Sequence, residues 1–334
     1  MIFQNIDFHN VEEMEPCAGG WQMYRVPHRV REKLNDRARQ LVCSYSTGVE
    51  LRFKIKGDSA TLILKAEDVK EARTAYIYYG TFQGGWEYSS KTVFTHDTRI
   101  TISAPDHLES LEQIYREQRL GFHPAVVRLV LPYSTCIFVG VEGEVEPPEQ
   151  GDLPDQTYLA YGSSITHGSL ALAPPYSYPF RIAQKMNSDY INMGMAGCAH
   201  LEKEMAEYLI SRQDWDFGSV EMGINMIGPE FSIEEFENRV REFLRIMASA
   251  SRPVFVTSLF GFNGEYQRKA EQYRKIVAES VKPYLNSNKS NICFIDGLKL
   301  LDNPAFISQD MTHPTLEGLE EIADKWYRVM REVI

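Results

Sequence analysis

The hydrophobic pattern of this chain changes near residues 145–154, where prolines, glycine and acidic residues replace apolar runs. Before this segment, short runs rich in β-branched and aromatic residues predict strands, and there is almost no long helical pattern. After it, short apolar runs alternate with longer segments whose apolar residues recur every three or four positions. We therefore expect a β-sandwich, jelly-roll-like domain over residues 1–150 and an α/β domain over residues 155–334.

The strand candidates agree with this division. Those of the first half are 51–55, 60–64, 75–79, 99–103, 126–131 and 136–141. Those of the second half are 157–161, 190–193, 219–222, 254–259 and 292–295, each followed by a helix candidate. The second series predicts a doubly wound three-layer sandwich, in which a mainly parallel five-stranded sheet lies between two layers of helices.

Three helices of the second half have clear sequence signals. Ser232 followed by Glu235 is typical of a capping box, and an apolar stripe begins at the next residue. A second helix is predicted over about residues 265–285, although Pro283 should end or kink it. The last helix is expected to start after Pro314, with the proline at its first turn.

A serine, an aspartate and a histidine of the second half form a candidate catalytic group. Ser164 follows the first strand of the predicted sheet, and such sheets bind ligands beyond the carboxyl ends of their strands. A serine nucleophile needs a neutral imidazole to accept its proton, and the imidazole needs a carboxylate on its other nitrogen. Asp310 and His313 are close enough in sequence to converge from one turn. We expect Ser164 to attack, His313 to act as base and Asp310 to orient His313.

The next two strands lead into residues suited to stabilising an oxyanion. Residues 192–197 follow the second strand and contain two glycines, and residues 221–225 follow the third strand and end in asparagine. A glycine N–H and an asparagine amide both donate hydrogen bonds without adding charge, as a tetrahedral intermediate requires. Serine, glycine, asparagine and histidine are therefore expected to meet at one edge of the sheet.

With these four blocks in order, residues 155–334 resemble the SGNH subgroup of the GDSL esterase/acylhydrolase family. The resemblance implies that Gly197, Asn225 and the Ser164 N–H form the oxyanion hole, and that the fold is the α/β sandwich predicted above. The first half is similar in architecture to the accessory domain of some SGNH carbohydrate esterases and of an acyltransferase of polyketide tailoring.

Two residues depart from the family pattern. Ser163 stands where the family's Gly-Asp-Ser has aspartate, and Met226 stands where its Gly-x-Asn-Asp has a second aspartate. Neither departure removes a reacting group. Both change the hydrogen bonds that brace the nucleophile turn and the asparagine.

Further residues are candidates for lining a substrate pocket, and packing is an equal alternative for the aromatic ones. They are His167, Tyr176, Tyr178, Glu221, Phe260 and Phe262. We expect His167 at the pocket rim rather than as the base, because it has no aspartate partner nearby in sequence. In the first half, a platform for stacking a sugar and a place in the core are both open for Tyr78, Tyr79, Trp86 and Tyr88.

Composition narrows the choice of partners. The 334 residues include 35 basic and 46 acidic side chains, a net charge of -11 that lacks the basic footprint of nucleic-acid binding. No apolar segment is long enough to cross a membrane, and the chain starts without a signal-peptide pattern, so we expect a cytoplasmic protein. Neither a metal-binding motif nor a phosphate-binding loop occurs, so no metal and no cofactor are expected.

The sequence thus predicts a serine esterase that forms an acyl-enzyme on Ser164. Its substrate is expected to be a small-molecule or oligosaccharide ester that carries a small acyl group, acetyl above all, on a sugar or related hydroxylated molecule. Two alternatives stay open. One is an acyltransferase that uses the same acyl-enzyme, and the other is a carbohydrate-binding protein whose second half has lost activity.

Overall fold

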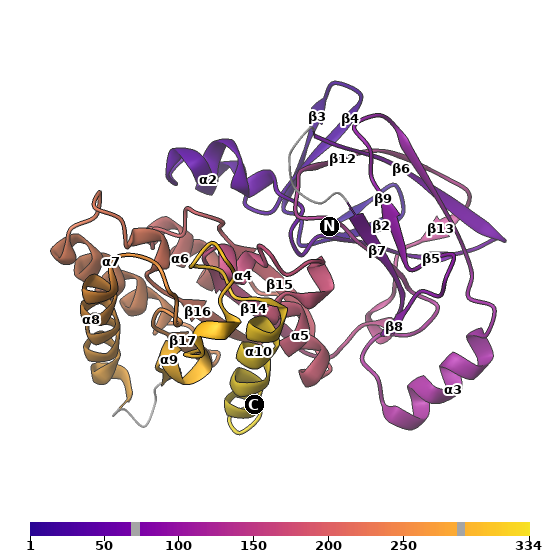
Figure 1. Cartoon of the computed structure of the whole chain (residues 1–334). Coiled ribbons are helices and arrows are strands. Elements are labelled where there is room, and N and C mark those ends of the chain that lie inside the picture. The colour runs from indigo at the N-terminus through magenta and orange to yellow at the C-terminus, as the bar shows by residue number, and fades with distance from the viewer. Residues whose placement is uncertain (68–73, 286–290) are drawn as a thin grey trace.

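The structure is a computed structural model that describes residues 1–67, 74–285 and 291–334. Antiparallel strands dominate the N-terminal half, and a parallel sheet between helices forms the C-terminal half (Figure 1). The predicted fold class is confirmed for both halves.

The C-terminal sheet has five parallel strands in the order β15-β14-β16-β17-β18. They are β14 (Thr157–Gly162), β15 (Asp189–Gly194), β16 (Phe217–Glu221), β17 (Val254–Thr257) and β18 (Ile292–Ile295). All five lie where the sequence predicts a strand. Because the second strand in sequence lies on one side of β14 and the third on the other, the strand order reverses at β14, which is where such sheets bind ligands.

Helices cover both faces of this sheet (Figure 1). They are α4 (Ser164–His167), α5 (Tyr178–Met186), α6 (Lys203–Ser211), α7 (Ile233–Met247), α8 (Gln267–Leu285), α9 (Gly297–Leu300) and α10 (Leu316–Met330), with short 3-10 turns η2 (Gln150–Asp152), η3 (Pro174–Tyr176), η4 (Ile224–Met226) and η5 (Pro304–Phe306). Leu159 and Tyr161 of β14 share one apolar core with α6, α7 and α8. Tyr158 and Ala160 share another with α5 and α10, as the alternation of side chains along a strand requires.

The helix boundaries differ from the predictions at two prolines. The last helix, α10, starts at Leu316, and the hydroxyl of Thr315 caps it by accepting the Gly318 N–H, so Pro314 lies before the helix rather than in its first turn. Helix α8 continues through Pro283 to Leu285, so the proline does not end it there.

The cap predicted for α7 is confirmed in part. Ser232 accepts the Glu235 N–H at 3.0 Å, as in a capping box. The Glu235 carboxylate pairs with Arg239 one turn later at 2.8 Å, so only the serine half of the box is seen.

The N-terminal half contains two antiparallel sheets on a common apolar core. Their strands are β1 (Ile2–Phe3), β2 (Ile6–His9), β3 (Glu13–Cys17), β4 (Gly20–Tyr24), β5 (Glu50–Ile55), β6 (Ser59–Ala66), β7 (Thr74–Tyr79), β8 (Phe82–Gln83), β9 (Ser90–Thr92), β10 (Thr98–Ser103), β11 (Val127–Val130), β12 (Cys136–Glu142) and β13 (Val145–Glu146). All six predicted strands are present. The sequence analysis missed β1 to β4 and the short strands β8, β9 and β13. It also missed helix α3 (Leu108–Gln118), which buries no residue although its apolar side chains recur at helical spacing.

One segment of the N-terminal half packs against the C-terminal half. It contains α1 (His28–Arg31), α2 (Asp36–Gln40) and η1 (Val42–Ser44), and Figure 1 shows α2 lying over the α/β side of the molecule. The buried side chains of Val30, Leu34 and Ala38 join the core that α6 and α7 share with β14. The predicted division at residues 150 and 155 stays a prediction, because the two halves share this core.

Candidate active site

The turn after β14 presents Ser164 as the first residue of α4. The Ser163 hydroxyl caps this helix by accepting the Ile165 N–H at 3.1 Å, and the Ser163 N–H donates to the Glu221 carboxylate at 2.6 Å. Gly162 leaves no room for a side chain, because an added Cβ would lie 2.1 Å from the Thr166 hydroxyl. The turn is therefore braced by its own cap and by a carboxylate from the neighbouring strand β16.

The loop before α10 brings His313 and Asp310 to this serine. The Nε2 atom of His313 lies 2.8 Å from Ser164 Oγ, and its Nδ1 atom lies 2.6 Å from Asp310 Oδ2. The other Asp310 oxygen accepts hydrogen bonds from the Ser308 hydroxyl at 2.7 Å and from the Thr312 and His313 N–H groups at 2.9 Å each. With Nδ1 protonated toward the carboxylate, Nε2 is left to accept the serine proton.

Hydrogen bonding keeps Asp310 ionised. Partial burial opposes the charge, but the bonds from Ser308, from the two N–H groups and from His313 hold the pKa of this carboxyl well below its usual range. The carboxylate therefore stays charged through the pH range in which a histidine gains and loses its proton.

A pocket of about 490 Å³ opens onto these residues. The five predicted catalytic and oxyanion-hole residues that line it are Ser164, Gly197, Asn225, Asp310 and His313. The Asn225 side-chain oxygen accepts the Ala199 N–H at 3.1 Å, which leaves the Nδ2 group as the donor end of the amide. Gly197 has a φ of +71°, a backbone conformation that a side chain would strain.

Arg37 of α2 also lines the pocket, and the sequence analysis missed it. Its Nε donates to the Ala196 carbonyl at 3.0 Å, and the same Nε lies 3.0 Å from where a Cβ on Gly197 would be. No local signal could have found it, because α2 belongs to the half of the chain that carries no catalytic motif.

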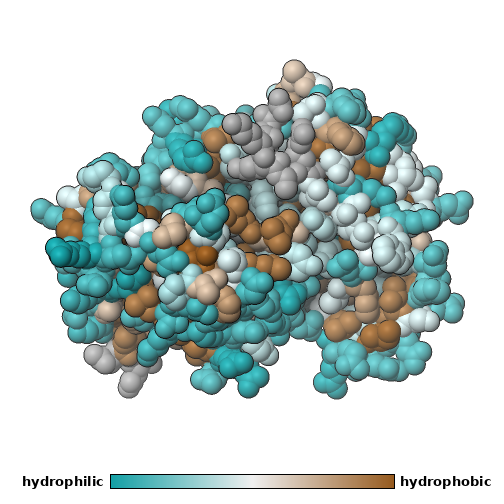
Figure 2. All heavy atoms as spheres, viewed as in Figure 1, coloured by the Kyte–Doolittle hydropathy of each residue, from teal (hydrophilic) through white to brown (hydrophobic). Residues whose placement is uncertain are grey.

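Bulky apolar side chains surround the pocket. Leu170 and Tyr266 line it; Leu172 lies two residues after Leu170, and Met311 lies between the lining residues Asp310 and Thr312. All four are exposed and have φ between +63° and +69°, which is an uncommon conformation for residues other than glycine. Apolar side chains gather near the middle of the face in Figure 2, where the two halves meet.

His167 does not lie at the pocket rim, which corrects the prediction. It is buried, and its Nε2 lies 2.7 Å from the Thr47 hydroxyl of the N-terminal half. Burial, together with the nearby Arg25 charge, lowers the pKa of His167 to about 3, so it is neutral near pH 7. The N-terminal half covers this face of α4, and the sequence of α4 alone does not show that.

Four other candidate pocket residues do not line the pocket, and for Tyr178 and Phe260 the packing alternative holds. Glu221, Tyr178 and Phe260 are buried behind the pocket, where Glu221 braces the nucleophile turn and the two aromatic rings pack together at 6.1 Å. Tyr176 lines a separate groove beside α10. Phe262 alone among the six lines the pocket. Glu221, Tyr178 and Phe260 follow a strand or a turn as predicted, but their side chains are buried in the core, whereas that of Tyr176 is exposed.

Burial raises the pKa of Glu221, although hydrogen bonds from Ser163 and Thr166 oppose this shift.

In the N-terminal half, Tyr79, Trp86 and Tyr88 line a separate depression of about 360 Å³. Tyr78 is buried against Phe180 of α5, so the four aromatic residues do not form one platform.

The N-terminal half covers the open edge of β15, the strand that leads to Gly197. Three backbone carbonyls on this edge, which would pair with another strand, accept hydrogen bonds from N-terminal side chains instead. The contacts are His9 Nε2 with Tyr190 O at 2.6 Å, Asn10 Nδ2 with Asn192 O at 3.0 Å, and Arg25 with Asn192 O at 2.9 Å and Gly194 O at 3.1 Å. The strand edge is thus fixed by side chains rather than by a sixth strand.

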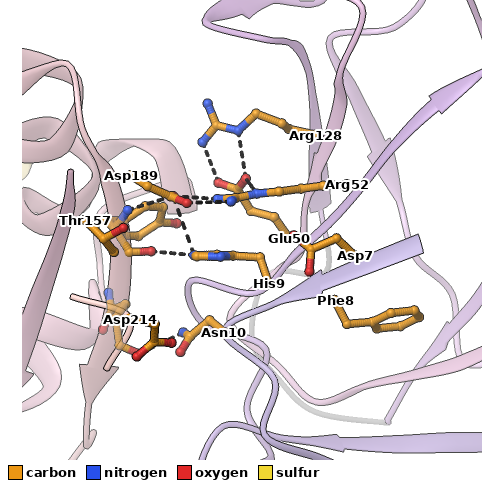
Figure 3. Close-up of polar contacts among 12 residues, drawn as sticks. Asp7, Phe8, His9, Asn10, Glu50, Arg52, Arg128, Thr157, Asp189 and Asp214 are labelled. Atoms are coloured by element: carbon orange, nitrogen blue, oxygen red, sulfur yellow. Dashed lines mark hydrogen bonds and ion pairs between the residues drawn. The ribbon is translucent and has the colours of Figure 1, made fainter. Parts of the chain in front are cut away.

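A buried ion cluster lies at the start of the same strand (Figure 3). Both terminal nitrogens of Arg52 donate to Asp189 at 2.6 Å, and its Nε donates to Glu50 at 2.8 Å. Arg128 donates twice to Glu50 at 2.7 Å. Burial opposes the charge of Glu50, but the two guanidinium groups prevail and lower its pKa to about 2. This cluster, which we call the junction cluster (Glu50, Arg52, Arg128 and Asp189), ties β5 and β11 to β15.

Within the three described ranges, no group of three or more histidine, cysteine, aspartate or glutamate side chains is placed to hold a metal ion. No helix in this part of the chain has the length and apolar content needed to span a bilayer.

A serine, a histidine and an aspartate that meet beside the carboxyl edge of a parallel α/β sheet are the arrangement of a serine hydrolase. A sequence model of the GDSL-like lipase/acylhydrolase family matches residues 156–331, and the chain belongs to this family. It is therefore a carboxylic ester hydrolase by family.

Solved structures share the fold over nearly the whole chain. A salicylyl-acyltransferase, SsfX3, from a tetracycline biosynthetic pathway is 16% identical with a TM-score of 0.77, covering 98% of this chain and 95% of that one. A GDSL-like lipase of Bacteroides ovatus is 18% identical with a TM-score of 0.66, covering 92% and 91%. A family two carbohydrate esterase from Cellvibrio japonicus is 13% identical with a TM-score of 0.57, covering 99% and 95%. The search of curated proteins found no match.

Proposed function

We propose that this protein is a serine esterase that removes a small acyl group, acetyl above all, from a hydroxyl of a sugar or related small molecule. The observation that carries this proposal is the line of contacts from Asp310 through His313 to Ser164, at 2.6 and 2.8 Å, which ends in an open pocket. In the proposed roles, Ser164 is the nucleophile, His313 the base and Asp310 the group that orients His313.

The proposed reaction has two halves. His313 takes the Ser164 proton as Oγ bonds to the ester carbon, and the carbonyl oxygen becomes an oxyanion that the N–H groups of Ser164 and Gly197 and the Asn225 amide bind. Collapse of this intermediate breaks the bond to the alcohol, which leaves with the proton from His313. Water then loses a proton to His313, attacks the acyl-enzyme and releases the acid, which restores Ser164.

The choice of substrate class is supported by a fold likeness to carbohydrate esterases over most of the chain. These include a carbohydrate esterase family 2 enzyme of Corynascus thermopiles and an acetyl xylan esterase of Butyrivibrio proteoclasticus, both with TM-scores above 0.5. The N-terminal half contributes to the pocket through Arg37, so both halves take part in recognising the substrate.

The test combines covalent labelling with turnover. A fluorophosphonate should add once to the wild-type protein by intact mass, and 4-nitrophenyl acetate should be hydrolysed. Both results should be lost in Ser164→Ala. Ser169→Ala is the matched control, because this serine lines the same pocket and makes no side-chain hydrogen bond to His313 in the described part of the chain; it should keep the adduct. A folded wild-type protein that gives neither adduct nor turnover would contradict the proposal.

An acyltransferase is the second candidate, because the same acyl-enzyme can react with an alcohol in place of water. The likeness to the salicylyl-acyltransferase extends over both halves of the chain and favours this candidate. Mass spectrometry of products formed with sugar alcohols present separates the two. Acyl transfer that exceeds hydrolysis at millimolar acceptor would favour the acyltransferase, and hydrolysis alone would favour the esterase.

A further inference from the structure

We propose that Arg37 binds an anionic group of the substrate, a carboxylate above all. The natural substrate then carries a free acid group in addition to the ester that is cut. This inference rests on the proposed function, because it uses the same pocket. It adds a specificity residue from the N-terminal half and a substrate class that the family does not define.

Arg37 is exposed, and its side chain is positioned by one hydrogen bond of its own and by the anchoring of its helix through Asn35. Its helix α2 is capped by Asn35, whose side chain accepts the Ala38 N–H at 3.1 Å. The Asn35 amide also donates to the Cys198 carbonyl at 2.9 Å and to Glu202 at 2.6 Å, which ties α2 to the loop that carries Gly197. The Nε of Arg37 is bonded to Ala196 O on that loop. A preorganised guanidinium loses less freedom on binding than a free surface arginine.

The outer nitrogens of this guanidinium have no acidic partner among the described residues. Arg39 on the same helix makes a useful contrast, because it pairs with Asp36 at 2.8 Å and with Glu32 at 3.5 Å. Arg37 makes one bond through Nε, to a carbonyl, and its two terminal nitrogens remain as donors beside the pocket. A planar guanidinium with two such donors matches the geometry of a carboxylate.

The remaining charges of the pocket do not neutralise Arg37. Asp310 is bonded to His313, and Glu265 is exposed and forms no ion pair with Arg37 in the described part of the chain. Arg37 lies beside Gly197, next to the position proposed for the oxyanion. An anionic group on either the acyl or the alcohol part of an ester can reach this side of the pocket, and charge attraction there also favours its capture from solution.

Two pairs of probe esters test the inference, each pair differing only in charge. The 4-acetoxybenzoate anion and its methyl ester carry the difference on the alcohol side. The 4-nitrophenyl half-ester of adipic acid and its methyl ester carry it on the acyl side. The quantity to compare is the ratio of kcat/KM for the charged ester to that for the neutral one, in wild type, Arg37→Gln, Arg37→Ala and the matched control Arg39→Gln.

In at least one pair, this ratio should fall by about 10- to 100-fold in both Arg37 variants, mainly through KM, and should not fall in Arg39→Gln. The wild-type ratio should also fall as salt is added. A loss in the benzoate pair assigns the anion to the alcohol, and a loss in the adipate pair assigns it to the acyl group. Ratios that are the same in wild type and both Arg37 variants, for both pairs, would overturn the inference.

The neutral esters and the fluorophosphonate adduct report on the esterase itself, so a failure of the proposed function is recognised separately. Anion binding does not need turnover, and calorimetry with 4-hydroxybenzoate and with adipate, against their methyl esters, tests Arg37 even in an inactive protein. Tighter binding of an acid than of its ester that is lost in Arg37→Gln would support the inference. No preference for either acid would overturn it.

Discussion

Asp310 in the active site and Asp189 in the junction cluster are both aspartates with pKa values held below the usual range, but their surroundings differ. The side chain of Asp310 is 35% exposed and pairs with His313, whereas that of Asp189 is 8% exposed and pairs with Arg52. A histidine can exchange its proton near neutral pH, and an arginine cannot. The same kind of side chain therefore has two roles. At Asp310 it prepares a proton transfer, and at Asp189 it holds the two halves of the molecule together.

The two aspartates also differ in how much of the fold depends on their charge. Asp310 keeps its charge through hydrogen bonds from its own loop, so little of the fold depends on it. Asp189 keeps its charge through Arg52 of the other half, and removing one member of a buried pair leaves an unpaired charge. The change from aspartate to asparagine should therefore lower mainly the activity at position 310 and mainly the stability at position 189.

The largest expected effect is that of Asp310→Asn on activity. An amide next to Nδ1 favours the wrong imidazole tautomer, so kcat should fall by about 10⁴. The measurement is steady-state hydrolysis of 4-nitrophenyl acetate, with urea unfolding as the control for stability. A drop of less than tenfold would mean that Asp310 does not orient the base.

Asp189→Asn should act on stability instead. Loss of the charge opposite Arg52 should lower the free energy of unfolding by about 3–5 kcal/mol. Urea unfolding measures this change, and fluorophosphonate titration of the remaining folded protein should still find one reactive serine. An unfolding free energy within 1 kcal/mol of wild type would contradict the stabilising role of Asp189.

Asn225→Ala tests whether the oxyanion contact acts only in the transition state. With one donor removed, kcat should fall by about 10² to 10³ while KM changes little. Its matched control is Asn238→Ala, an asparagine on the outer part of α7 away from the site. An increase in KM at constant kcat would assign Asn225 to substrate binding rather than to the oxyanion.

The smallest effect is the dependence of stability on acid. The pKa of Glu50 is lowered to about 2 in the folded protein, whereas a glutamate in an unfolded chain has a pKa of about 4.3. The unfolded state then binds more protons as the pH falls, so this stabilising contribution is present above about pH 4 and is lost toward pH 2. Urea unfolding at pH 7, 4 and 3 should show the decline below pH 4, and a constant midpoint over this range would contradict it.

Much of the α/β half could be predicted because its signals are local. The period of the apolar residues gives strands and helices, and parallel strands place their carboxyl ends at one edge. Asp310 and His313 meet within one turn, so their pairing needs no knowledge of the rest of the fold. The residues that line the pocket with them, Ser164, Gly197 and Asn225, all follow strands of the same sheet.

Local patterns were thus enough to predict the fold class of both halves and the five residues that meet at the pocket. Three placements depend on packing between distant segments: Arg37 enters the pocket, His167 is buried against Thr47, and Glu221 braces the nucleophile turn. They could not be predicted because the partners lie far apart in the sequence. These contacts join residues 159, 120 and 58 positions apart, and the periodicity of a chain reports which face of an element is buried without reporting what covers it.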